Sequence, residues 1–109
     1  MPPLEVRYRP EAASDLEDIF RIVERISGSR DTAYRYVQRI GERCRKIGIL
    51  PRAGRPRDDL MPGLRTVSFE RIAVITYLVV GDIVEVANIF YGGRDYEALY
   101  RGTTDTGDA

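Results

Sequence analysis

Residues 60–99, LMPGLRTVSFERIAVITYLVVGDIVEVANIFYGGRDYEAL, decide the fold because they hold three successive strand patterns and two turn signals. Side chains alternate over residues 64–69, and residues 72–80 are nearly all apolar and rich in β-branched side chains. Residues 83–91 return after a Gly-Asp turn. This order predicts a β-meander, in which consecutive strands pair antiparallel.

The strands over residues 72–91 are apolar on both faces. A sheet with one face in water should alternate more cleanly between apolar and polar residues. We therefore expect both faces to be covered, one by upstream helices and the other by a partner protein. In the central strand, one face carries Val74, Leu78 and Val80, and the other carries Ala73, Ile75, Tyr77 and Val79.

The first half of the chain predicts a short strand and two helices. Residues 4–8 alternate as a half-buried strand does, and Pro10 suits a helix start. Apolar residues recur at helical spacing over residues 12–26, which predicts an amphipathic helix of about four turns. A second helical stripe runs over residues 33–47, and the short linker between the two predicts an antiparallel hairpin.

Individual residues of the second helix have expected roles. Ser29 or Asp31 can cap its start, and Gly48 stands where a C′ glycine would end it. Gly41, inside the helix, is interpreted as a close-packing position. Cys44 lies on the apolar stripe and is interpreted as a core residue rather than a nucleophile.

Together these patterns predict a single α+β domain over residues 1–101, in the order β-α-α-β-β-β. A helical hairpin packs on one face of a four-stranded, mainly antiparallel sheet, and a short C-terminal helix follows over residues 95–100. Residues 51–63 are interpreted as a loop rich in Pro, Gly and Arg. Residues 102–109 are small and polar, which predicts a disordered tail.

Composition excludes several kinds of chemistry. The 109 residues include no histidine, so Ser-His-Asp, Cys-His and His-metal sites cannot form within this chain. The single cysteine excludes an intramolecular disulfide and a cysteine-based zinc site. We expect no metal and no cofactor. No signal peptide and no run of about 18 apolar residues is visible, which predicts a cytoplasmic protein.

The formal net charge is zero but unevenly distributed. Residues 10–27 carry a net charge of −3, residues 28–57 carry +7 and residues 58–109 carry −5. Nearly all of the positive charge is arginine, which favours bidentate contacts with carboxylates or phosphates. Two interpretations remain open. The basic helix balances the charge of the acidic helix beside it, or the basic residues form a patch that faces a partner.

The order and spacing of four motifs resemble the RelE/ParE superfamily of toxins from type II toxin–antitoxin modules. The resemblance covers residues 4–100. It rests on Tyr8-Arg9-Pro10-Glu11-Ala12, Ala33-Tyr34-Arg35-Tyr36-Val37, Pro62-Gly63-Leu64-Arg65 and Ile89-Phe90-Tyr91-Gly92-Gly93-Arg94-Asp95.

The resemblance implies two competing activities. RelE-like members cleave mRNA on the ribosome. In this chain the catalytic residues for that reaction would be Arg65, Arg71, Tyr91 and Arg94. Tyr91 stands where relatives often have histidine, and an ordinary tyrosine pKa near 10 makes a poor general base. RNA binding also favours a strongly basic protein. We therefore favour the ParE-like branch, a non-enzymatic inhibitor of DNA gyrase. A RelE-like ribosome-dependent endoribonuclease and an inert protein-interaction module stay open as alternatives.

The resemblance also implies partners. A cognate antitoxin, ParD-like with a DNA-binding ribbon-helix-helix part, would wrap the toxin with its C-terminal segment and form a hetero-oligomer. We expect no specific nucleic-acid binding by this chain itself and no membrane contact. The expected antitoxin-binding residues are Arg35, Arg39, Arg43, Ile75, Tyr77 and Val79. The expected gyrase-binding residues are Tyr91, Arg94, Asp95 and Tyr96, because binding determinants often lie on segments at the rim of a rigid scaffold.

Overall fold

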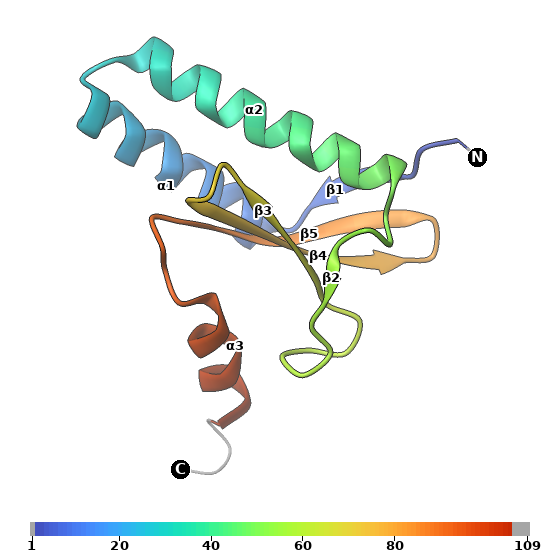
Figure 1. Cartoon of the computed structure of the whole chain (residues 1–109). Helices are drawn as coiled ribbons and strands as arrows, with labels where there is room; N and C mark the ends of the chain where they lie inside the picture. Colours follow the sequence, from blue (N-terminus) through green and yellow to red (C-terminus); the bar gives the residue numbers. More distant parts are fainter. Residues whose placement is uncertain (1, 106–109) are drawn as a thin grey trace.

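The computed structural model describes residues 2–105 and has a helical hairpin above a five-stranded sheet, with a third helix below it (Figure 1). The sheet order is β1-β5-β4-β3-β2; β1 runs parallel to β5, and the other neighbours are antiparallel. In chain order the elements are β1 (Glu5–Tyr8), α1 (Pro10–Ser27), α2 (Arg30–Ile49), β2 (Arg55–Pro56), β3 (Arg65–Phe69), β4 (Ala73–Val80), β5 (Ile83–Tyr91) and α3 (Tyr96–Asp105).

The predicted α+β order and the meander β3-β4-β5 are confirmed, but the sheet has five strands rather than four. The additional strand is β2, whose two residues pair with Arg65 and Thr66 of β3. A two-residue strand containing Pro56 is too short to show an alternation pattern, so it could not be predicted from local sequence. Proline is tolerated there because β2 lies at the sheet edge.

Local signals set the helix ends as expected. Pro10 is the first residue of α1, and Gly28 ends that helix in the left-handed region at φ 69°, with its N–H donating to Glu24 O. The Ser29 hydroxyl accepts a hydrogen bond from the Thr32 N–H at 3.1 Å, so Ser29 rather than Asp31 caps α2.

Two glycines of α2 have roles that differ from those predicted. Gly48 lies within the helix, and a Cβ there would be 2.6 Å from Leu4 O. It therefore lets β1 approach the helix, and the Leu4 N–H donates to Gly48 O at 2.9 Å. Gly41 is not a close-packing position, because a Cβ there would meet only Arg45 Nη1, at 3.9 Å.

The main core lies between the helical hairpin and the upper face of the sheet. Cys44 is fully buried in it, as predicted. Burial raises the pKa of its thiol, as expected for a core cysteine. Alternation along β4 places Ala73, Ile75 and Tyr77 on this face. The largest buried contributors are Ile19, Ile40, Ile47, Ile75, Tyr77, Val84, Val86 and Ile89.

The lower face of the sheet is covered in part by the chain itself, which corrects the expectation that a partner covers it. Leu60, Leu64, Phe90 and Tyr100 form a second buried cluster there, with Leu78 and Tyr96 packed against it. The helix expected over residues 95–100 extends to Asp105, so residues 102–105 belong to α3 and not to a tail. The rest of the predicted tail lies outside the described residues.

Hydrogen bonds connect α1 to α3 through the sheet. Asp15 on α1 accepts from the Ile89 N–H at 2.8 Å and from Asn88 Nδ2 at 3.2 Å. The Tyr100 hydroxyl of α3 bonds to Asn88 Oδ1 at 3.0 Å and to Thr76 Oγ1 at 2.9 Å. A register shift in the β4–β5 ladder at Thr76/Tyr77 accompanies this network. The position of α3 is therefore tied to both faces of the sheet.

Candidate functional site

One side of α2 carries Arg35, Arg39 and Arg43, which we call the arginine stripe. This stripe is only partly available to a partner. Arg35 pairs with Asp31 at 2.8 Å on its own helix, and Arg39 pairs with Glu70 at 2.9 Å. Arg43 has no ion pair with any described residue. No stripe residue pairs with α1 among the described residues, so the acidic helix does not balance this stripe. The two helices share one contact of that kind, between Arg30 and Glu24 at 4.0 Å.

Two of the three apolar residues expected to bind an antitoxin are in the core. Ile75 and Tyr77 are 0% exposed, because they point toward the helical hairpin. The Tyr77 hydroxyl accepts from the Gly54 N–H at 3.0 Å and donates to Pro51 O at 2.9 Å, and burial raises its pKa. Both residues are thus structural. Val79 is half-buried and lines a surface groove.

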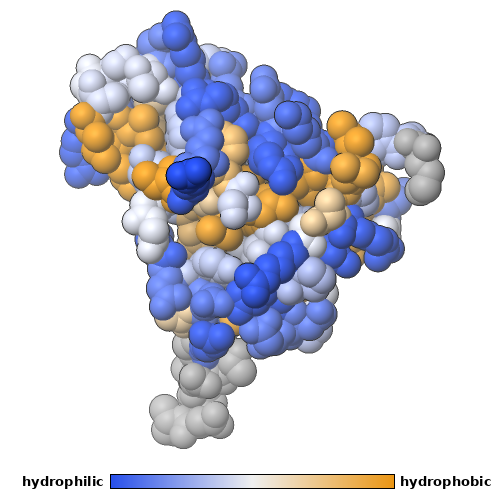
Figure 2. All heavy atoms as spheres, in the orientation of Figure 1, coloured by the Kyte–Doolittle hydropathy of each residue, from blue (hydrophilic) through white to orange (hydrophobic). Residues whose placement is uncertain are grey.

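The sheet has an open edge beside the stripe. Strand β2 covers only Arg65 and Thr66, so residues 67–69 of β3 have no neighbouring strand on that side among the described residues. Figure 2 shows a hydrophobic band across this face of the molecule, with hydrophilic side chains above and below it. An extended segment can pair with such an edge through its main chain.

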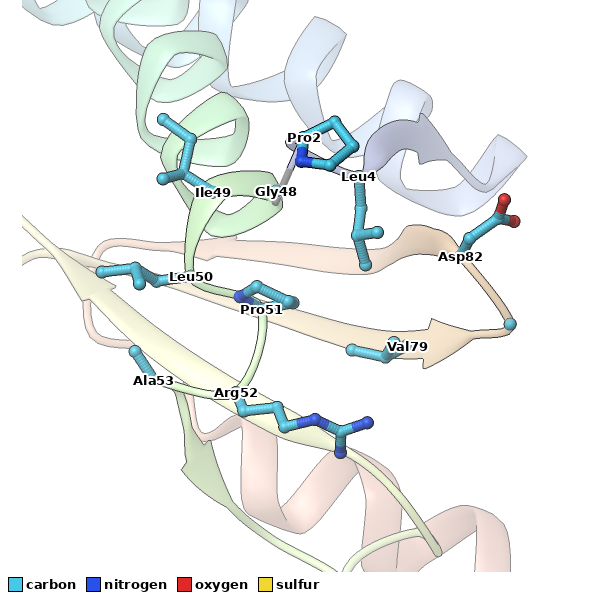
Figure 3. A pocket seen from close by; sticks show the side chains of 11 residues that line it. Pro2, Leu4, Gly48, Ile49, Leu50, Pro51, Arg52, Ala53, Val79 and Asp82 are labelled. Carbon is cyan, nitrogen blue, oxygen red and sulfur yellow. The ribbon is translucent and has the colours of Figure 1, made fainter.

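A second surface feature lies where α2 ends, which we call the α2-end groove (Figure 3). Its volume is about 480 Å³. Ile49 and Leu50 at its margin are 59% and 66% exposed. Apolar side chains lie between two charged residues, Arg52 and Asp82. The groove is lined by Pro2, Leu4, Gly48, Ile49, Leu50, Pro51, Arg52, Ala53, Val79, Gly81 and Asp82.

The residues expected to contact gyrase differ in availability. Tyr91 is half-buried and packs edge-on against Tyr36, with ring centroids 5.7 Å apart. Asp95 Oδ1 accepts from the Ala98 N–H at 3.1 Å and so stabilises the start of α3. The Tyr96 hydroxyl accepts from Arg57 Nη1 at 3.1 Å. Arg94 is exposed, with its guanidinium 5.9 Å from the Phe90 ring centroid, and has no ion pair among the described residues.

Sequence reasoning missed Arg57, which fastens α3 to the preceding loop. Its side chain is 8% exposed and forms ion pairs with Asp59, at 2.8 Å, and with Glu97 of α3. These two carboxylates raise the Arg57 pKa, and the Arg57 guanidinium lowers the pKa of Asp59 to about 2. Arg57 and Glu97 are far apart in sequence, so no local pattern indicates that they meet.

Arg65 lies apart from two other residues of the nuclease hypothesis, Arg71 and Tyr91. Arg65 Nη1 donates to the carbonyl oxygens of Arg52 and Gly54, at 2.9 and 2.8 Å. Arg71 lies in the turn at the far end of β3, about 13 Å along the strand from Arg65. Tyr91 lies at that far end too, because it pairs with Ala73. A cation at Arg65 and an acid at Tyr91 therefore do not share one phosphate-sized site.

The described part of the chain has neither a candidate metal cluster nor a membrane-spanning helix. Within residues 2–105, no cluster of three His, Cys, Asp or Glu side chains could hold a metal ion. None of the three helices in that range is both long and apolar enough to cross a membrane.

Comparison with known proteins decides the family. Residues 6–96 match the family described as "ParE toxin of type II toxin-antitoxin system, parDE". The chain belongs to the ParE toxin family. The match covers most of the chain, so the predicted superfamily and its ParE-like branch are confirmed.

Two relatives agree with this assignment to the ParE toxins. The curated protein "Toxin ParE3" from Caulobacter vibrioides is 36% identical over 93 residues, which are 85% of this chain and 90% of that protein. The solved structure "Chromosomal ParDE TA system from P. aeruginosa" aligns with a TM-score of 0.71 at 26% identity, covering 82% of this chain and 96% of that one. The predicted helical hairpin on a largely antiparallel sheet is thus found in a solved relative.

Proposed function

We propose that this ParE toxin inhibits DNA gyrase by binding it, without catalysing a reaction, and that a cognate antitoxin neutralises it. One observation favours this over ribosome-dependent cleavage of mRNA. The Arg65 guanidinium is committed to two backbone carbonyls and lies at the opposite end of β3 from Arg71 and Tyr91. Metal-independent RNA cleavage needs an acid, a base and a cation around one phosphate.

The antitoxin surface in this proposal joins the stripe to the open edge of β3. An extended antitoxin segment would pair with residues 67–69, and its carboxylates would meet Arg35 and Arg43. Arg35 is 72% exposed although paired, and Arg43 has no competing carboxylate within the described chain. A segment that folds on binding suits such an elongated surface, because main-chain bonds and side-chain contacts accumulate along it. Val79 would contribute from the neighbouring groove.

The gyrase contact in this proposal centres on Arg94. Of the four residues predicted for this role, Arg94 is exposed and has no ion pair within residues 2–105, whereas Asp95 and Tyr96 also hold α3 in place. Gly92 and Gly93, both at positive φ, carry the chain from β5 to this rim. Arginine is enriched among the residues that dominate binding energy at protein interfaces.

A supercoiling assay tests the proposal. Purified toxin added to gyrase and relaxed plasmid should block supercoiling and accumulate cleaved DNA, and addition of antitoxin should restore supercoiling. Arg94→Ala should need a toxin concentration at least about tenfold higher for the same block, since interface arginines often contribute more than 1 kcal/mol. Arg25→Ala, an exposed position on α1, is the matched control and should behave as the wild type. Equal potency of Arg94→Ala and wild type would contradict the assigned contact.

A further inference from the structure

The α2-end groove is an apolar surface that no described part of the chain covers. Leu50 and Ile49 stand at its margin with most of their side-chain surface in water, and Val80 of the adjoining strand end is 52% exposed. Helix α3 does not cover this groove, because it packs on the opposite face of the sheet (Figure 1). Apolar surface gathered in this way is typical of an association site.

The described lining of the groove carries one cation and one anion. Arg52 and Asp82 lie at separate edges, with apolar residues such as Pro51 and Val79 between them (Figure 3). Neither side chain has an ion pair with another described residue. Arg7 forms its ion pair with Glu5. Both charges therefore remain available to a second molecule.

This arrangement complements itself. A two-fold symmetric contact uses the same patch on both subunits. If residue i of one subunit contacts residue j of the other, then residue j of the first also contacts residue i of the second. An axis between Arg52 and Asp82 brings the cation of each copy to the anion of the other. The same operation brings the two apolar floors together, with the protruding Leu50 of each copy directed at the other groove.

We infer that the α2-end groove is the contact surface between two copies of this chain in the absence of antitoxin. The loop that carries Arg52 is anchored, because Arg65 Nη1 bonds to Arg52 O and the Tyr77 hydroxyl bonds to Pro51 O. The surface thus needs little ordering on association, which lowers the cost of binding. We expect a weak dimer, with a dissociation constant on the order of 10 µM.

Sedimentation equilibrium of the full chain over a concentration series tests the inference. Wild type should pass from monomer to dimer, and Arg52→Asp or Asp82→Arg alone should each weaken the dimer about tenfold at low salt. The double variant, with both charges exchanged, should regain the dimer, because the symmetric contact then re-forms with reversed signs. Leu50→Asp should abolish it. Ile26→Asp, also an exposed apolar residue but on α1, is the control and should leave the dimer intact.

Three results would overturn the inference. One is a monomer at every concentration with native circular dichroism. Another is a dimer that survives Leu50→Asp, or one that the double exchange fails to restore. The third is a Leu50→Asp variant whose only defect is weaker antitoxin binding, which would assign the groove to the antitoxin instead of a second copy.

Discussion

Arg39 on α2 and Glu70 in the turn between β3 and β4 form a two-point contact, with Nε at 2.9 Å and Nη2 at 3.2 Å from the two carboxylate oxygens. The contact joins the helical layer to the open edge of the sheet. Both side chains are about half exposed, so it adds little to stability, about 0–1 kcal/mol. Its larger consequence is that it occupies the middle of the arginine stripe with an internal carboxylate.

The first prediction separates paired from unpaired arginines of the stripe. Arg43→Glu should weaken antitoxin binding, and more at low than at high salt, because Arg43 has no ion pair within the described chain. Glu70→Gln should strengthen antitoxin binding by up to about fivefold, because it releases Arg39 for a partner carboxylate. Titration calorimetry at two salt concentrations measures both. Unchanged affinity of Arg43→Glu at low salt would mean that the stripe is not part of the interface.

The second prediction uses the two glycines of α2 as a matched pair. Gly41→Ala should raise the free energy of unfolding by about 0.5–1 kcal/mol, because the added methyl makes only an ordinary contact with Arg45 Nη1 at 3.9 Å and alanine favours the helix. Gly48→Ala should lower it, since the methyl would lie 2.6 Å from Leu4 O and displace β1. Urea denaturation of both variants gives the comparison. Equal effects of the two substitutions would refute these assignments.

The third prediction tests the reassignment of Tyr77 from partner contact to core. Tyr77→Phe removes the hydroxyl that bonds to Gly54 and Pro51. The Gly54 N–H and the Pro51 carbonyl oxygen then lose this hydrogen-bond partner. The cost should be about 1–3 kcal/mol, seen as a lower melting temperature. Antitoxin affinity of the folded variant should not change. A normal melting temperature with weakened antitoxin binding would restore Tyr77 to the interface.

Local patterns predicted most of the fold. Alternation over the meander, the turn at Gly81-Asp82 and the helical stripes through Ile40 and Cys44 each report contacts close in sequence, so they could be read directly. The role of α3 could not be predicted in this way, because the contact between Tyr100 and Thr76 joins segments that are distant in sequence and meet only in the folded chain. For the same reason, local sequence could not show that the chain itself covers part of the second apolar face of β4.

The candidate site was less predictable than the fold. The spacing of Arg35, Arg39 and Arg43 correctly predicted that they lie on one side of the helix. It could not reveal that Arg39 forms an ion pair with Glu70. Alternation along β4 identified two faces, yet not that the face of Ile75 and Tyr77 lies under the helices. Arg57 was missed because its partner Glu97 comes from a distant segment.

The fourth prediction concerns acid pH. The Arg57 guanidinium lowers the pKa of Asp59 to about 2 from its ordinary value near 4. A lowered folded-state pKa stabilises the fold above about pH 4, and this contribution disappears as the pH falls from about 4 to about 2. Thermal unfolding followed by circular dichroism should therefore show a steeper loss of stability in that window for wild type than for Asp59→Asn. Parallel curves would show that the ion pair does not stabilise the attachment of α3.

We propose that this ParE toxin stops gyrase by binding it rather than by catalysing a reaction. The most direct measurement adds purified toxin to gyrase with relaxed plasmid and, in parallel, to a translation reaction read by primer extension. If the toxin acts by binding, the supercoiling block should scale with the ratio of toxin to gyrase, with cleaved plasmid accumulating and no new mRNA ends appearing. Codon-phased mRNA cuts that are lost in Arg65→Ala, with supercoiling untouched, would contradict it.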